Sequence, residues 1–368
     1  MNLSASAIRL ADVLHVARSQ GASDVHLSPN IAPVTRVDGF LEYLSGPVME
    51  PHEVRSIAAS LVGEEQLQRL DGGADVSATY ADRVLGLIRV HAFGVEGGMA
   101  LALRLLHKSV PTLESLHLPP IVGRLCERDR GLILFAGPTG SGKSTSLAAA
   151  IDRINASMPR HVITIEDPIE YRHSSKRSVV VQRQIGADTV SFSEALIGAL
   201  RADPDVIVVG EMRDASTIQA ALTAAETGHL VLASIHTGDG VQTIDRIIDA
   251  FSGTAQSQIR AQLSQALLAI ISQRLVRRAN GPGRRAVAEI VIATDAVRNI
   301  IRESRTHQLR NLIVTGRQLG MQTLEQHLNE LLVHREITRE AALSVTERPS
   351  EIDPVSAAAA GSSDAGII

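Results

Sequence analysis

Four short runs of strand-forming residues alternate with segments of helical spacing in the second half of the chain. The runs are GLILFAG, HVITIED, DVIVVGE and HLVLASIHT, and they begin at residues 131, 161, 205 and 229. Continuous apolar runs of this length are typical of parallel strands that are buried on both faces of a sheet. One intervening segment starts at Ser191, with Glu194 three residues later, as expected for a capped helix. The pattern predicts repeated strand–helix–strand units, and hence an α/β fold with a parallel sheet.

The rest of the chain has other patterns. Apolar residues recur at helical spacing from Leu10 to Ala17, and the strand-like runs TRVDGFLEYL and LGLIRVHAF follow, so we predict a small α+β domain over residues 1–106. Residues 107–120 contain three prolines and little periodicity, which indicates a linker. The larger domain would span residues 121–345, with a mostly helical end. Residues 346–368 are poor in core-forming side chains, and we expect a disordered tail.

Composition limits the possible classes of protein. Of 368 residues, 44% are hydrophobic but only 2% are aromatic, so Leu, Ile, Val and Ala must form the cores. The net charge of −4 gives no overall basic field, which argues against direct binding of nucleic acid. Apolar runs are too short to span a membrane. Cys126 is the single cysteine, which excludes a disulfide within one chain and indicates a cytoplasmic protein.

The segment GPTGSGKST, residues 137–145, matches the phosphate-loop pattern of nucleotide-binding proteins. A strand-like run precedes it and a helical segment follows it, which is the required context. Backbone N–H groups of the loop would enclose phosphates at a helix N-terminus. Lys143 would contact the β- and γ-phosphates of ATP, and the Ser144 hydroxyl would bind Mg²⁺. The predicted nucleotide-binding residues are Gly137, Pro138, Thr139, Gly140, Ser141, Gly142, Lys143, Ser144 and Thr145.

Carboxylates follow two of the predicted strands. Glu211 comes after VIVV and Gly210, while Glu166 and Asp167 come after ITI. Because the carboxyl ends of parallel strands open onto one ligand crevice, we expect these acids to converge on the phosphates. Glu211 would be a metal ligand together with Ser144, and either glutamate could orient the attacking water. The sequence does not decide whether Glu211 or Glu166 is the general base.

Two histidines flank the run LVLASI. In an extended strand His229 and His236 would be roughly 20 Å apart, at about 3.3 Å per residue, so they cannot share a metal ion. His236 would lie at the ligand-facing end, where it could contact the γ-phosphate or the loop that senses it. His229 would be a structural residue bonded to the backbone. A role without any ligand stays open for both.

Taken in order, these motifs resemble those of the secretion and type IV pilus ATPases. GPTGSGKST matches the Walker A box, TIEDPIEY the Asp box, VGEMRD the Walker B box and TAAETGHLVLASIHT the His box. GASDVHLSPNIAPVTRVDG matches in the first domain, so the resemblance covers about residues 8–345. AVRNIIRE, residues 296–303, is similar to a motif of the retraction branch, called PilT-type. The assembly and type II secretion branches usually carry a four-cysteine metal loop, which this chain cannot form.

The resemblance implies a RecA-like ATPase core with bound ATP and Mg²⁺, preceded by a PAS-like domain. It also implies a homo-hexamer at the cytoplasmic face of the inner membrane, only peripheral to that membrane, with a pilus platform protein as partner. Each nucleotide would lie between two subunits. Arg89 and Arg104 would reach its phosphates from the first domain of a neighbour, and Arg246 is a further candidate from the core. Both His229 and His236 are implicated in activity.

The implied function is a motor that drives type IV pilus retraction and thereby twitching motility. A pilus-assembly or type II secretion ATPase is one alternative, and a nucleotide-binding regulator that does not hydrolyse ATP is another. Glu96 stands where relatives commonly have a basic residue, which keeps the regulator open.

AVRNIIRE has the spacing of an amphipathic helix. Val297, Ile300 and Ile301 would share one face, beside a charged stripe formed by Arg298 and Arg302. The stripe would either be a solvated helix edge or transmit the nucleotide state to the pilus machinery.

Overall fold

A computed structural model of the chain describes residues 10–37, 39–82, 86–106, 109–281 and 283–353. The chain divides into two compact units, Met1–Ser109 and Val110–Ile368. None of the helices in the described ranges is long and apolar enough to cross a membrane.

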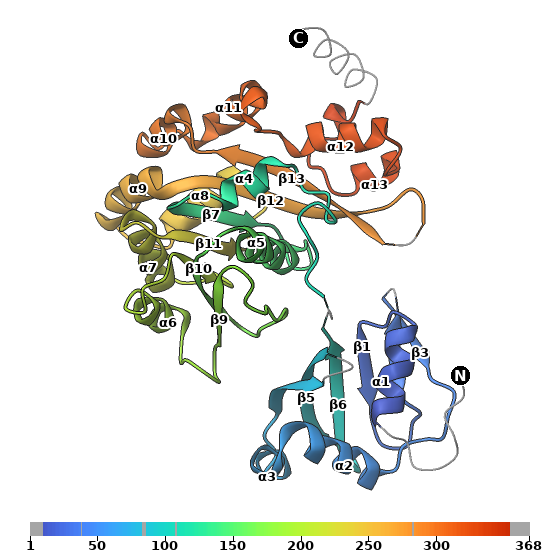
Figure 1. Ribbon diagram of the computed structural model, residues 1–368. Helices are drawn as coiled ribbons and strands as arrows, with labels where there is room; N and C mark the ends of the chain where they lie inside the picture. The colour runs from blue at the N-terminus through green and yellow to red at the C-terminus, as the bar shows by residue number, and fades with distance from the viewer. Residues whose placement is uncertain (1–9, 38, 83–85, 107–108, 282, 354–368) are drawn as a thin grey trace. The chain divides into compact units, whose positions relative to one another are not determined.

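The first unit is an α+β fold around a six-stranded antiparallel sheet with the order β3-β2-β1-β6-β5-β4 (Figure 1). Its strands are β1 (Asp24–Leu27), β2 (Val34–Val37), β3 (Phe40–Tyr43), β4 (Val76–Asp82), β5 (Gly86–Val95) and β6 (Gly98–Leu105). Its helices are α1 (Leu10–Ser19), α2 (Pro51–Val62) and α3 (Glu64–Asp71). Successive strand residues point to opposite faces, so Val25 and Leu103 are buried with the helices while Asp24 and Arg104 face the other way. The predicted small α+β domain is confirmed.

The second unit is built on a seven-stranded sheet with the order β13-β12-β7-β11-β10-β8-β9 (Figure 1). Its strands are β7 (Gly131–Ala136), β8 (His161–Glu166), β9 (Val179–Gln184), β10 (Val206–Val209), β11 (Leu230–Ile235), β12 (Leu267–Arg277) and β13 (Arg284–Ile292). All pairs are parallel except β12 with β13. The four predicted apolar runs form β7, β8, β10 and β11, so the predicted parallel sheet is confirmed.

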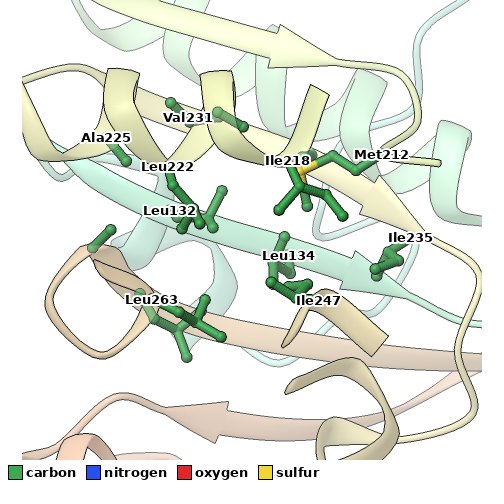
Figure 2. Close-up of a cluster of buried hydrophobic side chains, with 14 of the residues drawn as sticks. Leu132, Leu134, Met212, Ile218, Leu222, Ala225, Val231, Ile235, Ile247 and Leu263 are labelled. Atoms are coloured by element: carbon green, nitrogen blue, oxygen red, sulfur yellow. The ribbon is translucent and has the colours of Figure 1, made fainter. Parts of the chain in front are cut away.

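Helices cover both faces of this sheet. They are α4 (Ile121–Cys126), α5 (Lys143–Ser157), α6 (Phe192–Ala199), α7 (Ala215–Glu226), α8 (Gly240–Asp249), α9 (Ala255–Ala266), α10 (Asp295–Arg302), α11 (Leu309–Thr315), α12 (Leu324–Val333) and α13 (Arg339–Leu343). Leu132 and Leu134 of β7 pack with α7, α8 and α9, as Figure 2 shows. Ile133 and Phe135 of the same strand pack on the opposite face with α4 and α5. Burial on both faces explains why the central strands are continuously apolar.

The predicted linker is too long at its C-terminal end. Leu113 and Leu118 are buried in the same core cluster as α4 and α5, and the second unit begins at Val110. Leu113, Leu116 and Leu118 lie in a short stretch between Pro111 and Pro119, which is too short to show a clear hydrophobic period. Residues 107–108 of the predicted linker lie outside the described ranges.

The prediction of a disordered tail is wrong for residues 346–353. Pro349–Glu351 form a short 3-10 helix, and Ile352 is buried beside α12 and α13. Glu351 forms an ion pair with Arg310 of α11. A single buried isoleucine in a polar segment leaves no signal in the composition. Residues 354–368 of the predicted tail and residues 1–9 of the predicted first domain lie outside the described ranges.

Candidate nucleotide site

The phosphate-loop segment connects β7 to α5 at the carboxyl edge of the sheet. Gly137, Gly140 and Gly142 have φ angles of 147°, 78° and 93°, which side chains rarely adopt. A Cβ atom on Gly137 would lie 2.4 Å from the Ser141 Oγ and 2.6 Å from the Gln273 carbonyl oxygen. The glycines therefore allow the backbone to curl tightly above the N-terminus of α5, where N–H groups are free to bind an anion.

Lys143 lies under this loop as the first residue of α5. Its Nζ donates to the carbonyl oxygens of Gly137, at 2.8 Å, and Pro138, at 3.0 Å. Burial lowers the pKa of Lys143, while the charges of Glu211 and Glu170 oppose that shift. The Lys143 ammonium group therefore lies directly beside the phosphate loop.

Ser144 and Thr145 contact two residues that sequence reasoning missed. The Ser144 hydroxyl donates to the Glu170 carboxylate at 3.3 Å, and the Thr145 hydroxyl is 3.1 Å from the Tyr171 hydroxyl. Glu170 and Tyr171 lie in the loop that follows β8. The signal was present, because the same motif, IEDPIEY, contains a second glutamate four residues after the first.

The structure places Glu166 differently from the prediction. Its Oε1 accepts hydrogen bonds from the Thr164 hydroxyl, at 2.6 Å, and from the Gln182 amide, at 2.9 Å. Burial raises the pKa of Glu166, although these two hydrogen bonds oppose the shift. Asp167 is exposed. Neither residue contacts the phosphate loop in the described part of the chain, because β8 ends in a bend and the next carboxylate, Glu170, reaches Ser144 instead.

Glu211 and His236 meet at the ends of adjacent strands. Met212 N donates to the Ser234 carbonyl oxygen, at 2.9 Å, which fixes the segment after β10 beside the end of β11. The Glu211 Oε1 lies 3.2 Å from the His236 Nε2, and the His236 Nδ1 lies 3.4 Å from the Lys143 Nζ. The predicted residues Lys143, Glu211 and His236 therefore form one cluster.

The charge state of Glu211 follows from this cluster. Burial raises the pKa of Glu211, but the hydrogen bond from Arg213 and the charges of His236 and Lys143 outweigh it, so the net pKa is below the ordinary value. The Arg213 Nη2 lies 2.7 Å from the Glu211 Oε2. Glu211 thus stays ionised and can balance a cation.

His229 lies at the opposite end of β11, away from the phosphate loop. Its Nδ1 is 3.0 Å from the Ala224 carbonyl oxygen at the end of α7, and its backbone carbonyl accepts from Gly131 N at 3.0 Å. These contacts join α7, β7 and β11. Within one chain, His229 therefore has the geometry of a structural residue.

The three predicted arginines lie on two separate units. Arg89 and Arg104 are opposite each other on β5 and β6 of the first unit, on its exposed sheet face. The Arg104 Nε lies 2.9 Å from the Asp24 Oδ1. Arg246 is exposed in the last turn of α8 and has no hydrogen bond or ion pair with another described residue. In the described ranges, neither Arg89 nor Arg246 has a hydrogen bond or ion pair, so both guanidinium groups can bind an anion.

The oxygen donors beside the loop fit a small, hard cation. The Ser144 hydroxyl and the carboxylates of Glu170 and Glu211 are the ligand types that Mg²⁺ prefers. Over the described residues, no group of three or more His, Cys, Asp and Glu forms a metal cluster. Mg²⁺ usually keeps several waters and binds phosphate oxygens together with one or two protein ligands.

Comparison with known proteins gives matches over nearly the whole chain. A sequence model of the family described as type II/IV secretion system protein matches residues 4–348. The chain is 42% identical over 340 residues to the type IV pilus retraction ATPase PilT of Pseudomonas aeruginosa, covering 92% of this chain and 98% of the relative. It is 44% identical over 310 residues to a twitching motility protein of Neisseria gonorrhoeae, covering 84% of this chain and 83% of the relative.

The fold is also similar to that of a solved structure. A crystal structure of the pilus retraction motor PilT with bound ADP superposes with a TM-score of 0.87 at 43% identity, covering 94% of this chain and 98% of that chain. This likeness confirms the predicted RecA-like core with a preceding domain. The sequence matches confirm the predicted resemblance to the secretion and pilus ATPases.

Proposed function

We propose that this chain, which belongs to the type II/IV secretion system protein family and is a nucleotide-binding ATPase, hydrolyses ATP to drive type IV pilus retraction. The observation that carries this proposal is the cluster of Lys143, Glu211 and His236 at the phosphate loop, in a chain similar to a retraction ATPase over most of its length. We place the motor at the cytoplasmic face of the inner membrane, with a pilus platform protein as its partner.

The residues of the site would divide the work of hydrolysis. Loop N–H groups and Lys143 would hold the phosphates and balance the charge that develops on the transferred group. Ser144, with Glu211, would hold Mg²⁺, whose chemistry is to neutralise the phosphate oxygens. His236 would report the γ-phosphate to the segment that follows it, since it contacts both Lys143 and Glu211.

We propose Glu170 as the general base or water-orienting residue. Its carboxylate accepts a hydrogen bond from the Ser144 hydroxyl, and its negative charge favours the charged form of Lys143. Glu166 is occupied by Thr164 and Gln182 and would instead support the strand end. Glu211, paired with His236 and Arg213, suits the metal side of the site.

A homo-hexamer would complete each site, and this makes activity depend on assembly. We propose that Arg89 and Arg104 of a neighbouring subunit contact the nucleotide, with Arg246 as a further contributor. Arg104→Ala should retain ATP binding but lower turnover at least about tenfold, since the charge arrives only in the assembled ring. Steady-state phosphate release at several protein concentrations checks this, because wild-type specific activity should rise with concentration.

Arg55→Ala is the matched control for this prediction. Arg55 is also an exposed arginine of the first unit in an ion pair, with Asp71, but it lies on α2. Its turnover should stay near the wild-type value. A wild-type chain that is monomeric by light scattering and fully active would contradict the ring mechanism.

The structure corrects the expected charged stripe on α10. Val297, Ile300 and Ile301 are buried as predicted. Arg298, however, donates from Nη1 to the carbonyl oxygens of Ser264, at 2.5 Å, and Gln265, at 2.6 Å, at the end of α9. Arg298 therefore holds two helices together and is not free for a partner.

Arg302 is the arginine that remains exposed on α10, and its Nη2 donates to the Asn299 Oδ1 of the same helix, at 3.3 Å, with no other hydrogen bond or ion pair to a described residue. We propose that it couples the motor to the pilus machinery. Arg302→Ala should leave turnover within about twofold, as for most exposed substitutions, and abolish pilus retraction in cells. Arg298→Ala is the contrast and should lower the melting temperature. Normal retraction with Arg302→Ala would refute the coupling role.

A regulator that binds ATP without hydrolysis is the other candidate, favoured only by Glu96, which is exposed in the turn between β5 and β6. A phosphate-release assay on the purified wild-type chain separates the two functions. Multiple turnovers support the motor, whereas tight ATP binding without phosphate release supports the regulator.

A further inference from the structure

A buried carboxylate lies behind the His box loop and takes no part in the site described above. Glu289 of β13 is only 7% exposed, and its Oε1 accepts a hydrogen bond from Gly240 N at 2.8 Å. Gly240 is the first residue of α8. Glu289 thus ties the start of this helix to the edge of the sheet.

The start of α8 carries the segment that follows His236. The Thr237 hydroxyl lies 2.6 Å from the Thr243 hydroxyl, and Gly238 N donates to the Gln242 side chain at 2.9 Å. Asp239 caps the helix by accepting from Gln242 N at 2.8 Å. Residues 237–239 are therefore fixed relative to the first turn of α8.

Helix α8 and strand β13 are closely packed at Gly240. A Cβ atom on Gly240 would lie 2.7 Å from the Val291 Cγ2 and 3.3 Å from the Glu289 Oε1. The helix can approach this closely only because residue 240 is glycine. The hydrogen bond from Gly240 to Glu289 therefore sets a defined position for the helix start.

The buried surroundings of Glu289 disfavour the ionised form of its carboxyl group. Burial raises the pKa of Glu289 to about 7. The negative charges of Asp239 and Glu325 add to this shift, whereas the hydrogen bond from Gly240 N and the positive charge of Arg310 oppose it. Ser272, directly opposite Glu289 on β12, has a buried hydroxyl without a hydrogen-bond partner in the described residues. Glu289 and Ser272 line a cavity together with Arg274, Glu347 and Arg348. A carboxylate is costly to bury, and here it is the acceptor that satisfies the Gly240 N–H.

We propose that Glu289 is a positioning residue for ATP hydrolysis, which holds the start of α8 against β13 and thereby fixes His236 relative to Lys143 and Glu211. The proposal rests on the role of His236 proposed above. Glu289 is in register with Ser272 of β12, which pairs with Ala136 just before the phosphate loop, but its hydrogen bond goes to Gly240 N. We therefore expect it to act through α8 and the loop before it. It should influence the chemical step more than the binding of ATP, because the phosphate loop is held by other contacts.

The test compares Glu289→Ala with Glu289→Gln in the assembled protein. The alanine removes the acceptor of Gly240 N, so kcat should fall about tenfold while KM for ATP changes less than about twofold. The glutamine keeps an acceptor oxygen at the same reach and should restore kcat to within about twofold. Unchanged kcat with alanine, a loss confined to KM, or failure of glutamine to restore kcat would each overturn the proposal.

Glu325→Ala is the matched control, because Glu325 is a buried carboxylate on the same cavity, bonded instead to Arg310 and Thr346. It should lower the melting temperature without lowering kcat. An equal loss of kcat would mean general loosening and overturn the proposal.

A second variant, Gly240→Ala, approaches the contact from the other side and decides the outcome if Glu289→Ala does not fold. Its Cβ should push α8 from β13 and lower kcat about as much as Glu289→Ala does. Normal kcat in Gly240→Ala would overturn the proposal. His236→Ala separates the two hypotheses: if it is fully active, the proposed site fails, and if it is inactive while Glu289→Ala is normal, only the positioning role fails.

Discussion

Replacing Lys143 with alanine is expected to lower the rate of ATP hydrolysis at least about 1000-fold. The Lys143 ammonium group is buried at the mouth of the loop, where its Nζ now donates to the carbonyl oxygens of Gly137 and Pro138. A phosphate group would compete for the same ammonium, and the contact strengthens as charge develops on the transferred group. Steady-state phosphate release measures the effect, and circular dichroism checks that the fold is intact.

Lys176→Ala is the control for this substitution. Lys176 forms an ion pair with Asp152, with its Nζ 2.7 Å from the Asp152 Oδ1, on the exposed surface of the same unit. The same loss of one ammonium group should leave turnover nearly unchanged there. Turnover of Lys143→Ala within about threefold of wild type would show that the phosphate loop is not the site of hydrolysis.

Glu170→Gln should bind ATP and hydrolyse it at least about 100-fold more slowly. The amide keeps the size of the carboxylate and can still contact the Ser144 hydroxyl, but it cannot accept a proton from water. Single-turnover phosphate release, together with a fluorescent-nucleotide binding assay, separates the loss of chemistry from a loss of binding.

Glu166→Gln is the comparison that decides between the two glutamates of the Asp box. Glu166 accepts from Thr164 and Gln182 and does not reach the loop, so its substitution should cost less than about tenfold. A larger loss of turnover with Glu166→Gln than with Glu170→Gln would return the role of base to Glu166.

The elements whose burial is uniform were predictable from sequence. β7 and β10 are apolar throughout, and β8 and β11 are mostly apolar, because helices cover both faces of the sheet around them. β9 was not predicted, since it lies at the sheet edge, where Val179 and Val181 are exposed among polar residues. β12 was also missed, because its apolar stretch directly follows α9 without a turn residue between them.

The local part of the site was equally predictable. Lys143 and Ser144 take their positions from the loop itself, so a pattern of nine residues suffices. Glu170 was missed because its approach to Ser144 depends on the path of the chain after β8. The rule that functional carboxylates follow directly after a strand favours the first one, Glu166. Arg298 was misplaced for a similar reason: helical spacing shows its stripe on α10 but not the end of α9 that lies against it.

Imaging of pili on living cells tests the central claim most directly, because it separates retraction from assembly. Cells that lack this chain should carry long pili that do not retract, and the wild-type gene should restore retraction while the Lys143→Ala gene should not. Cells without pili would contradict the account, because they would make this ATPase an assembly motor.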